Sequence, residues 1–150
     1  APDFANPASM VKSIQEYCRR TSQPVPETKA AITRCIFESL ALRYRQVLDS
    51  LNKFAPAPIS ILHVIGGGSK NAMLNQFTAN ALGIPVAAGP MEATAIGNIM
   101  IQAKTAGLYD GISDMRKSIQ QSVELNWFEP QNSEEWEVQY GRFEQLTMDN

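Results

Sequence analysis

The sequence lacks the long apolar run that a membrane-spanning helix needs. Its longest such run, residues 59–65, is interrupted by Ser60 and His63, whereas a bilayer requires about 20 residues. An excess of basic residues is also missing, because 13 Lys and Arg stand against 15 Asp and Glu, for a net charge of −2. We therefore expect neither a membrane nor a nucleic acid as a partner.

Cysteine and histidine are scarce as well. Cys18 and Cys35 have no paired spacing, so the sequence predicts neither a disulfide framework nor a metal site. His63 falls inside an apolar run with no nucleophile in register, and we expect a hydrogen-bonded core histidine, not a catalytic triad. The cysteine usage leads us to expect a cytoplasmic protein. No leader segment is visible and the chain begins without Met, which leads us to expect a piece of a longer chain.

The composition and periodicity of the sequence predict one globular, helix-rich α/β domain. The 150 residues are 44% hydrophobic and 19% charged, which is enough to bury a core. Periodicity and capping residues predict helices starting at Asn6–Pro7, Lys29, Asn71, Pro90, Ser113 and Ser133. The segment 126–130 is expected to be a link between the last two helices.

Two apolar segments, Ile59–Ile65 and Ile84–Ala88, predict strands. A glycine turn and the helix 71–82 lie between them, which favours a short parallel βαβ core with helices on both faces. Gly83 is expected to end that helix in a left-handed turn. Ala93 and Gly97, one turn apart in the next helix, predict a close approach to a neighbouring element.

The best candidate site is the turn from Gly66 through Gly67 and Gly68 to Asn71. Glycines hold no Cβ between backbone and ligand, and the amides of a helix start suit a phosphate or a nucleotide edge. An equally open interpretation is that the glycines only permit a tight turn. The spacing is not that of a P-loop, since Lys70 is followed by Asn71, and Asn71 stands where a dinucleotide fingerprint has its third glycine.

The remaining conspicuous residues are interpreted as structural. Glu38 is expected on a solvated helix face, Glu92 at a helix start, and both cysteines on apolar faces. Arg45 and Asp49 are expected on the wetter face of the long helix. Trp136, Tyr140 and Phe143 recur at helical spacing and predict a packing stripe.

A longer pattern carries a family resemblance. The run LHVIGGGSKNAMLNQFTANALGIPVAAGPMEATAIGNIMIQ, residues 62–102, resembles the C-terminal part of the FGGY carbohydrate kinases. Residues 24–28 (PVPET) and 35–45 (CIFESLALRYR) extend it backwards. The stretch 88–94 (AGPMEAT after Ala87) and Gly97 resemble the family members that act on L-rhamnulose most closely.

This resemblance implies an actin-like ATPase (ribonuclease H-like) fold, with residues 1–150 as the C-terminal portion of the second kinase domain. It implies that Gly66, Gly67 and Gly68 lie against the adenosine of ATP and that Asn71 borders the adenine. Mg²⁺ would accompany ATP, and L-rhamnulose would be phosphorylated with an aspartate outside this chain as the base. No catalytic or metal-binding residue is then expected within the chain.

The same resemblance makes the N-terminal part of the kinase the expected partner. The chain alone is expected to be inactive and to self-associate through a sheet edge left open. A Rossmann-like nucleotide- or dinucleotide-binding module without kinase activity is the alternative that the residues themselves leave open.

Overall fold

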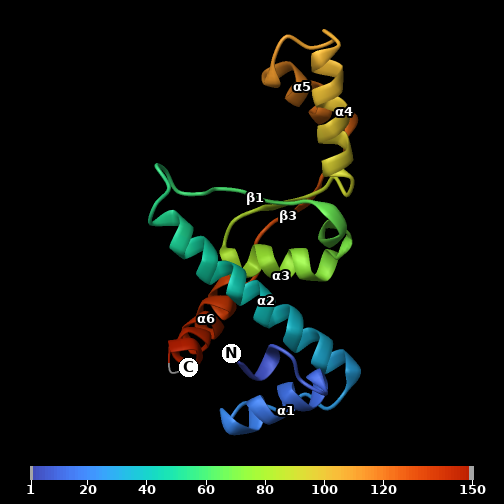
Figure 1. Ribbon diagram of the computed structural model, residues 1–150. Helices are drawn as coiled ribbons and strands as arrows, with labels where there is room; N and C mark the ends of the chain where they lie inside the picture. The colour runs from blue at the N-terminus through green and yellow to red at the C-terminus, as the bar shows by residue number, and fades with distance from the viewer. Residues whose placement is uncertain (1, 149–150) are drawn as a thin grey trace.

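The computed structural model describes residues 2–148 and shows a small sheet with helices packed on one face (Figure 1). In chain order the elements are η1 (Pro2–Phe4), α1 (Met10–Arg20), α2 (Lys29–Asn52), β1 (Leu62–Val64), η2 (Gly66–Lys70), α3 (Ala72–Leu82), β2 (Val86–Ala88), α4 (Ala93–Thr105), α5 (Ile112–Ser122), β3 (Asn126–Phe128) and α6 (Ser133–Met148). The predicted α/β, helix-rich class is confirmed.

The central helices begin and end where the local sequence predicts. Thr28 caps α2 by accepting a hydrogen bond from the Ala31 amide (3.1 Å). α3 ends at Gly83, whose φ of 67° is left-handed, as expected for a glycine cap. These signals are local side-chain and backbone chemistry, so they are readable from the chain alone.

Three predicted helix starts are wrong by a few residues. α4 was expected from Pro90 but begins at Ala93, after the N-cap residue Glu92. α1 begins at Met10, because Ser9 is its N-cap and its Oγ accepts from the Lys12 amide (3.4 Å), whereas Asn6 lies outside the helix. α5 has Gly111 as its N-cap, so the expected cap Ser113 lies inside the first turn. For α1 and α5, more than one residue near the start could serve as a cap.

The sheet confirms the parallel βαβ unit and adds a strand that was not predicted. β1 pairs in parallel with β2, and β2 pairs antiparallel with β3, in the order β1-β2-β3. The predicted strands were too long, since β1 and β2 have three residues each. β3 lies in the segment that was expected to be a link. The sequence did not predict this strand, because three residues are too few to show an alternating pattern.

Helices cover one face of β1 and leave the other open, which corrects the expectation of burial on both faces (Figure 1). Leu62 and Val64 are half-buried, whereas Ile61, His63 and Ile65 are exposed. Side chains alternate along a strand, so these three share the open face. His63 is therefore not the core histidine that the sequence predicted.

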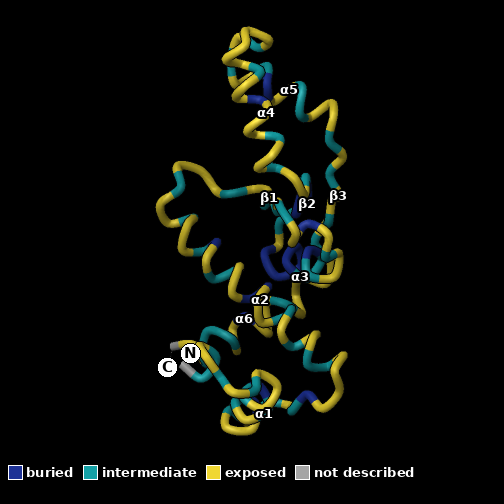
Figure 2. The backbone as a smooth tube through the Cα atoms, turned by 45° about the vertical axis from the view of Figure 1, so that its right-hand side comes forward, coloured by how far each residue is buried: buried dark blue, intermediate teal, exposed yellow. Residues whose placement is uncertain are grey.

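The core lies where α2, α3 and α6 meet beneath the sheet (Figure 2). Its buried members are Ala41, Leu42, Leu48, Ala81, Leu82 and Tyr140, with Ile59, Leu62, Phe77, Ile84, Trp136 and Phe143 packed around them. This cluster joins residues distant in sequence, and it holds α3 in place below the strands.

Helices α4 and α5 project away from this core (Figure 1). A Cβ built on Gly97 would have no atom within 4 Å. The close approach expected at Ala93 and Gly97 is therefore absent from the described chain. Among residues 2–148 no helix combines the length and apolar character needed to cross a membrane.

Candidate functional site

The glycine turn connects β1 to α3, as expected, and forms the short 3₁₀ helix η2. Asn71 ends this turn and caps α3, because its Oδ1 accepts a hydrogen bond from the Leu74 amide (3.1 Å). The predicted cap is confirmed. The turn therefore passes directly from a sheet edge into a helix N-terminus.

Backbone contacts anchor the two ends of the turn. The Gly66 amide donates to the Pro90 carbonyl (3.2 Å), which ties the turn to the segment after β2. The Asn71 amide donates to the Gly68 carbonyl (3.1 Å). The peptide bond between Gly89 and Pro90 is cis.

The three glycines differ in whether the backbone conformation requires a glycine at that position. Gly66 has a φ of +74°, a conformation that favours glycine. Gly67 and Gly68 do not: a Cβ on Gly67 would meet nothing within 4 Å, and one on Gly68 would lie 3.7 Å from Val64 Cγ1. The tight-turn interpretation thus explains Gly66 alone, and Gly67 and Gly68 leave an open backbone surface that the fold does not need.

An apolar groove of about 370 Å³ adjoins the turn. α2 contributes Tyr44, Val47 and Leu51, and the groove reaches Gly68 and the start of α3. The sequence predicted no groove here. Its lining depends on the packing of α2 beside β1, which no local pattern reports.

Two polar residues that sequence reasoning missed hold the turn from inside. Ser69 is buried and its Oγ donates to the Gly66 carbonyl (2.7 Å). Asn75 is 1% exposed, and its Nδ2 lies 3.0 Å from the Ser69 carbonyl and 3.4 Å from that of Gly68. Asn75 lies one turn after the capping residue Asn71, and this spacing from the cap is the signal that could have found it.

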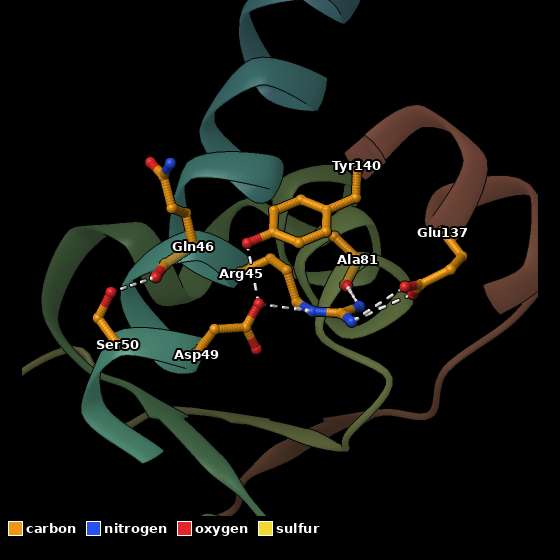
Figure 3. Close-up of polar contacts among 7 residues, drawn as sticks. All are labelled: Arg45, Gln46, Asp49, Ser50, Ala81, Glu137 and Tyr140. Carbon is orange, nitrogen blue, oxygen red and sulfur yellow. Dashed lines mark hydrogen bonds and ion pairs between the residues drawn. The ribbon is translucent and has the colours of Figure 1, made fainter. Parts of the chain in front are cut away.

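Arg45 is a further residue whose role the sequence did not predict (Figure 3). It was expected on a wet face, yet its guanidinium donates to the Ala81 carbonyl (2.7 Å) and pairs with Glu137 (3.1 Å) and Asp49 (3.4 Å). It also lies over the Tyr140 ring, 4.8 Å from the centroid. Arg45 therefore joins α2 to the end of α3 and to α6.

The carboxylates and thiols interpreted as structural do lie in structural positions. Glu38 forms an exposed ion pair with Arg34 (2.7 Å), and Glu92 is the N-cap residue of α4, with no side-chain capping bond. Cys18 is buried and Cys35 is half-buried, and burial raises the pKa of the Cys35 thiol. None of these groups adjoins the glycine turn in sequence.

The aromatic stripe of α6 is a packing stripe, as predicted. Trp136 packs against Phe77 with ring centroids 5.4 Å apart, and Tyr140 stacks on Phe143 at 6.5 Å. Within the described residues no three His, Cys, Asp or Glu side chains are grouped to hold a metal ion. Among the features that the sequence singled out, the turn with its adjoining groove is the one whose geometry suits binding chemistry.

Comparison with known proteins shows which family this chain is similar to. Residues 3–106 match the model of the FGGY family of carbohydrate kinases, C-terminal domain. The chain is 60% identical over 140 residues to the rhamnulokinase of Bacteroides thetaiotaomicron, covering 93% of this chain and 29% of the relative. It is 42% identical over 144 residues to that of Pectobacterium atrosepticum, covering 96% of this chain and 29% of the relative.

The chain spans less than a third of these relatives' length, 29% in each case. The match begins near the start of the described residues and includes α2, the glycine turn and α4. The chain therefore belongs to the FGGY family of carbohydrate kinases, as part of its C-terminal domain, with the actin-like ATPase fold class of that family.

Proposed function

We propose that this chain is the adenosine-binding portion of a kinase that phosphorylates L-rhamnulose with ATP. The observation that carries the proposal is the open surface of Gly67 and Gly68, two glycines that neither φ nor packing requires. A flat ligand group could approach this backbone closely, because neither glycine has a Cβ atom that would block it. The rhamnulokinase relatives supply the substrate class.

The residues present fit the nucleoside end of ATP. Gly66, Gly67 and Gly68 form the face against adenosine, and Asn71, at the end of the turn, borders the adenine while its Oδ1 caps α3. ATP would supply the phosphoryl group, and Mg²⁺ would come with its phosphates. This chain's task is to bind and orient the nucleotide.

Phosphoryl transfer needs the attacking hydroxyl and the phosphate held in line by groups on both sides of the nucleotide. We assign the second set, including the aspartate base, to the N-terminal part of the kinase, which is the partner of this chain. The chain alone is then inactive. As a sugar-metabolising enzyme of this kind, the complete protein is proposed to be cytoplasmic.

The Rossmann-like alternative has little support. The match to a kinase family covers residues 3–106, including the whole βαβ unit. A second, antiparallel neighbour for β2 also departs from a doubly wound parallel sheet. No observation in the described chain favours a dinucleotide over ATP.

The test is a chimera in which this chain replaces the matched 29% of the Bacteroides thetaiotaomicron relative. Gly68→Val should raise the KM for ATP roughly tenfold or more, because a branched side chain would occupy the adenosine face. The KM for L-rhamnulose should change less than twofold. Coupled detection of ADP measures both constants.

Gly111→Val is the matched control, because Gly111 has an extended φ of −163° and open space around its Cα. The chain without the rest of the kinase should release no ADP with L-rhamnulose. An unchanged KM for ATP in folded Gly68→Val chimera would return Gly68 to a purely conformational role and refute the proposed contact.

A further inference from the structure

Asn75 is a buried polar side chain that neither the helix nor the core explains. It is 1% exposed and lies in α3, one turn after the capping residue Asn71. Its side-chain amide reaches back to two carbonyls of the glycine turn, those of Ser69 (3.0 Å) and Gly68 (3.4 Å). A neutral amide nitrogen carries two hydrogens, which matches these two acceptors.

The other contacts of the turn show what this side chain accomplishes. The Gly66 carbonyl accepts from Ser69 Oγ (2.7 Å), and the Gly68 carbonyl also accepts from the Asn71 amide (3.1 Å). The carbonyls of Gly66, Gly68 and Ser69 are therefore engaged by groups of the turn and of α3. The positions of the missing Cβ atoms of Gly67 and Gly68 remain uncrowded.

We propose that Asn75 is a positioning residue that holds the glycine turn in its ATP-binding conformation, an inference that rests on the proposed function. Three glycines lose more backbone entropy on ordering than other residues. If the turn is ordered before the ligand arrives, that cost does not reduce affinity. Asn75 orders it from the buried side, without touching the ligand.

The inference predicts a selective kinetic effect. Asn75→Leu preserves approximate size but removes the hydrogen bonds to the Ser69 and Gly68 carbonyls, of which that of Gly68 keeps the Asn71 amide as a donor. In the chimera described above, this substitution should raise the KM for ATP roughly fivefold to tenfold, the equivalent of one or two neutral hydrogen bonds. The KM for L-rhamnulose should stay within twofold, since the sugar is held by another part of the kinase.

Asn80→Leu is the matched control. Asn80 is also buried in α3 (8% exposed), does not line the groove, and its Oδ1 accepts from Gln76 Nε2 and from the Gln131 amide (2.8 Å each). Its substitution disturbs the same helix without touching the turn. Both KM values should remain within twofold of those of the unsubstituted chimera.

The outcomes separate this inference from the proposed function. No L-rhamnulose kinase activity in the unsubstituted chimera would overturn the proposed function and, with it, the role of Asn75. An active chimera in which Asn75→Leu leaves the KM for ATP within twofold, or raises both KM values equally, would overturn the role of Asn75 alone.

A second variant and a second measurement cover the case in which Asn75→Leu fails to fold. Asn75→Asp keeps the shape of the side chain but replaces the donor by a carboxylate oxygen that faces two carbonyls. This variant should raise the KM for ATP more than the KM for L-rhamnulose. In the unsubstituted chain, the two Nδ2 protons of Asn75 should exchange slowly with solvent. Rapid exchange of both would show that the amide does not hold the turn.

Discussion

At the scale of single residues, the polar groups that matter most to the fold are those that connect elements. Arg45 and Tyr140 meet across α2 and α6, and Tyr140 donates its hydroxyl hydrogen to Asp49 (2.8 Å). Their periodicity placed Arg45 and Asp49 on a wet face, because helical spacing states which side a residue is on but not what covers that side. Their surroundings are determined by the end of α3 and by α6, which are distant in sequence.

This network predicts a pH dependence. Burial, and then the hydrogen bond to Asp49, raise the pKa of Tyr140 above its usual value near 10. A raised folded-state pKa contributes stability that is present below pH 10 and is lost as the pH rises further, because the unfolded tyrosine ionises more readily. Well above pH 10, the ionisation of Tyr140 in the unfolded chain lowers the free energy of unfolding by at most about 1.4 kcal/mol for each pH unit.

Tyr140→Phe removes the ionisable group and one hydrogen bond. At pH 7 it should lower the free energy of unfolding by about 1 kcal/mol. Above pH 10 the difference between the variant and the original chain should shrink and then change sign. Urea unfolding at pH 7 and pH 11 measures it, and an equal difference at both values would contradict the assignment.

At the scale of elements, the sequence predicted what local chemistry determines. Thr28, Asn71 and Gly83 mark the limits of α2 and α3 because a side-chain oxygen or a glycine acts within a few residues. β3 and the open face of β1 could not be predicted, since they depend on which segments meet in space. The glycine turn was located correctly, but the different demands on Gly66 and its two neighbours required the backbone angles.

The same substitution, glycine to alanine, should have opposite effects on stability at Gly83, which follows α3, and at Gly141, which lies inside α6. Gly83→Ala should lower the free energy of unfolding by about 1 kcal/mol, because Gly83 has a φ of +67° at the end of α3. Gly141→Ala should raise it by about 0.5–1 kcal/mol, because Gly141 lies inside α6 with open space around it. Denaturant midpoints compare the two variants, and effects of the same sign would be inconsistent with these backbone positions.

At the scale of the whole molecule, the apolar surface left open on one side of the sheet is the feature that needs an explanation. β1 has a single strand neighbour within the described chain. Leu62 donates to the Pro85 carbonyl (3.0 Å) and Val64 accepts from the Gly89 amide (2.8 Å), both towards β2. By alternation, the backbone groups of His63 point to the opposite, unpaired edge.

Apolar side chains surround this edge. Ile65 is 58% and Leu51 is 54% exposed, and both line the groove beside β1. Open edges bordered by apolar surface are templates for another strand. In the longer kinase that we propose, the N-terminal part would cover this side.

The isolated chain is therefore expected to self-associate through β1. Light scattering coupled to size exclusion, over a tenfold dilution, should show a mass above that of the 16.5 kDa monomer that falls with dilution. His63→Pro should shift the equilibrium towards monomer, because proline removes the donor on the free edge while the bonds of Leu62 and Val64 to β2 remain. His63→Ala keeps that donor and serves as the control. A strictly monomeric chain at every concentration, with a protected His63 amide, would mean that the described residues close their own sheet edge, and the kinase partner would then have to dock elsewhere.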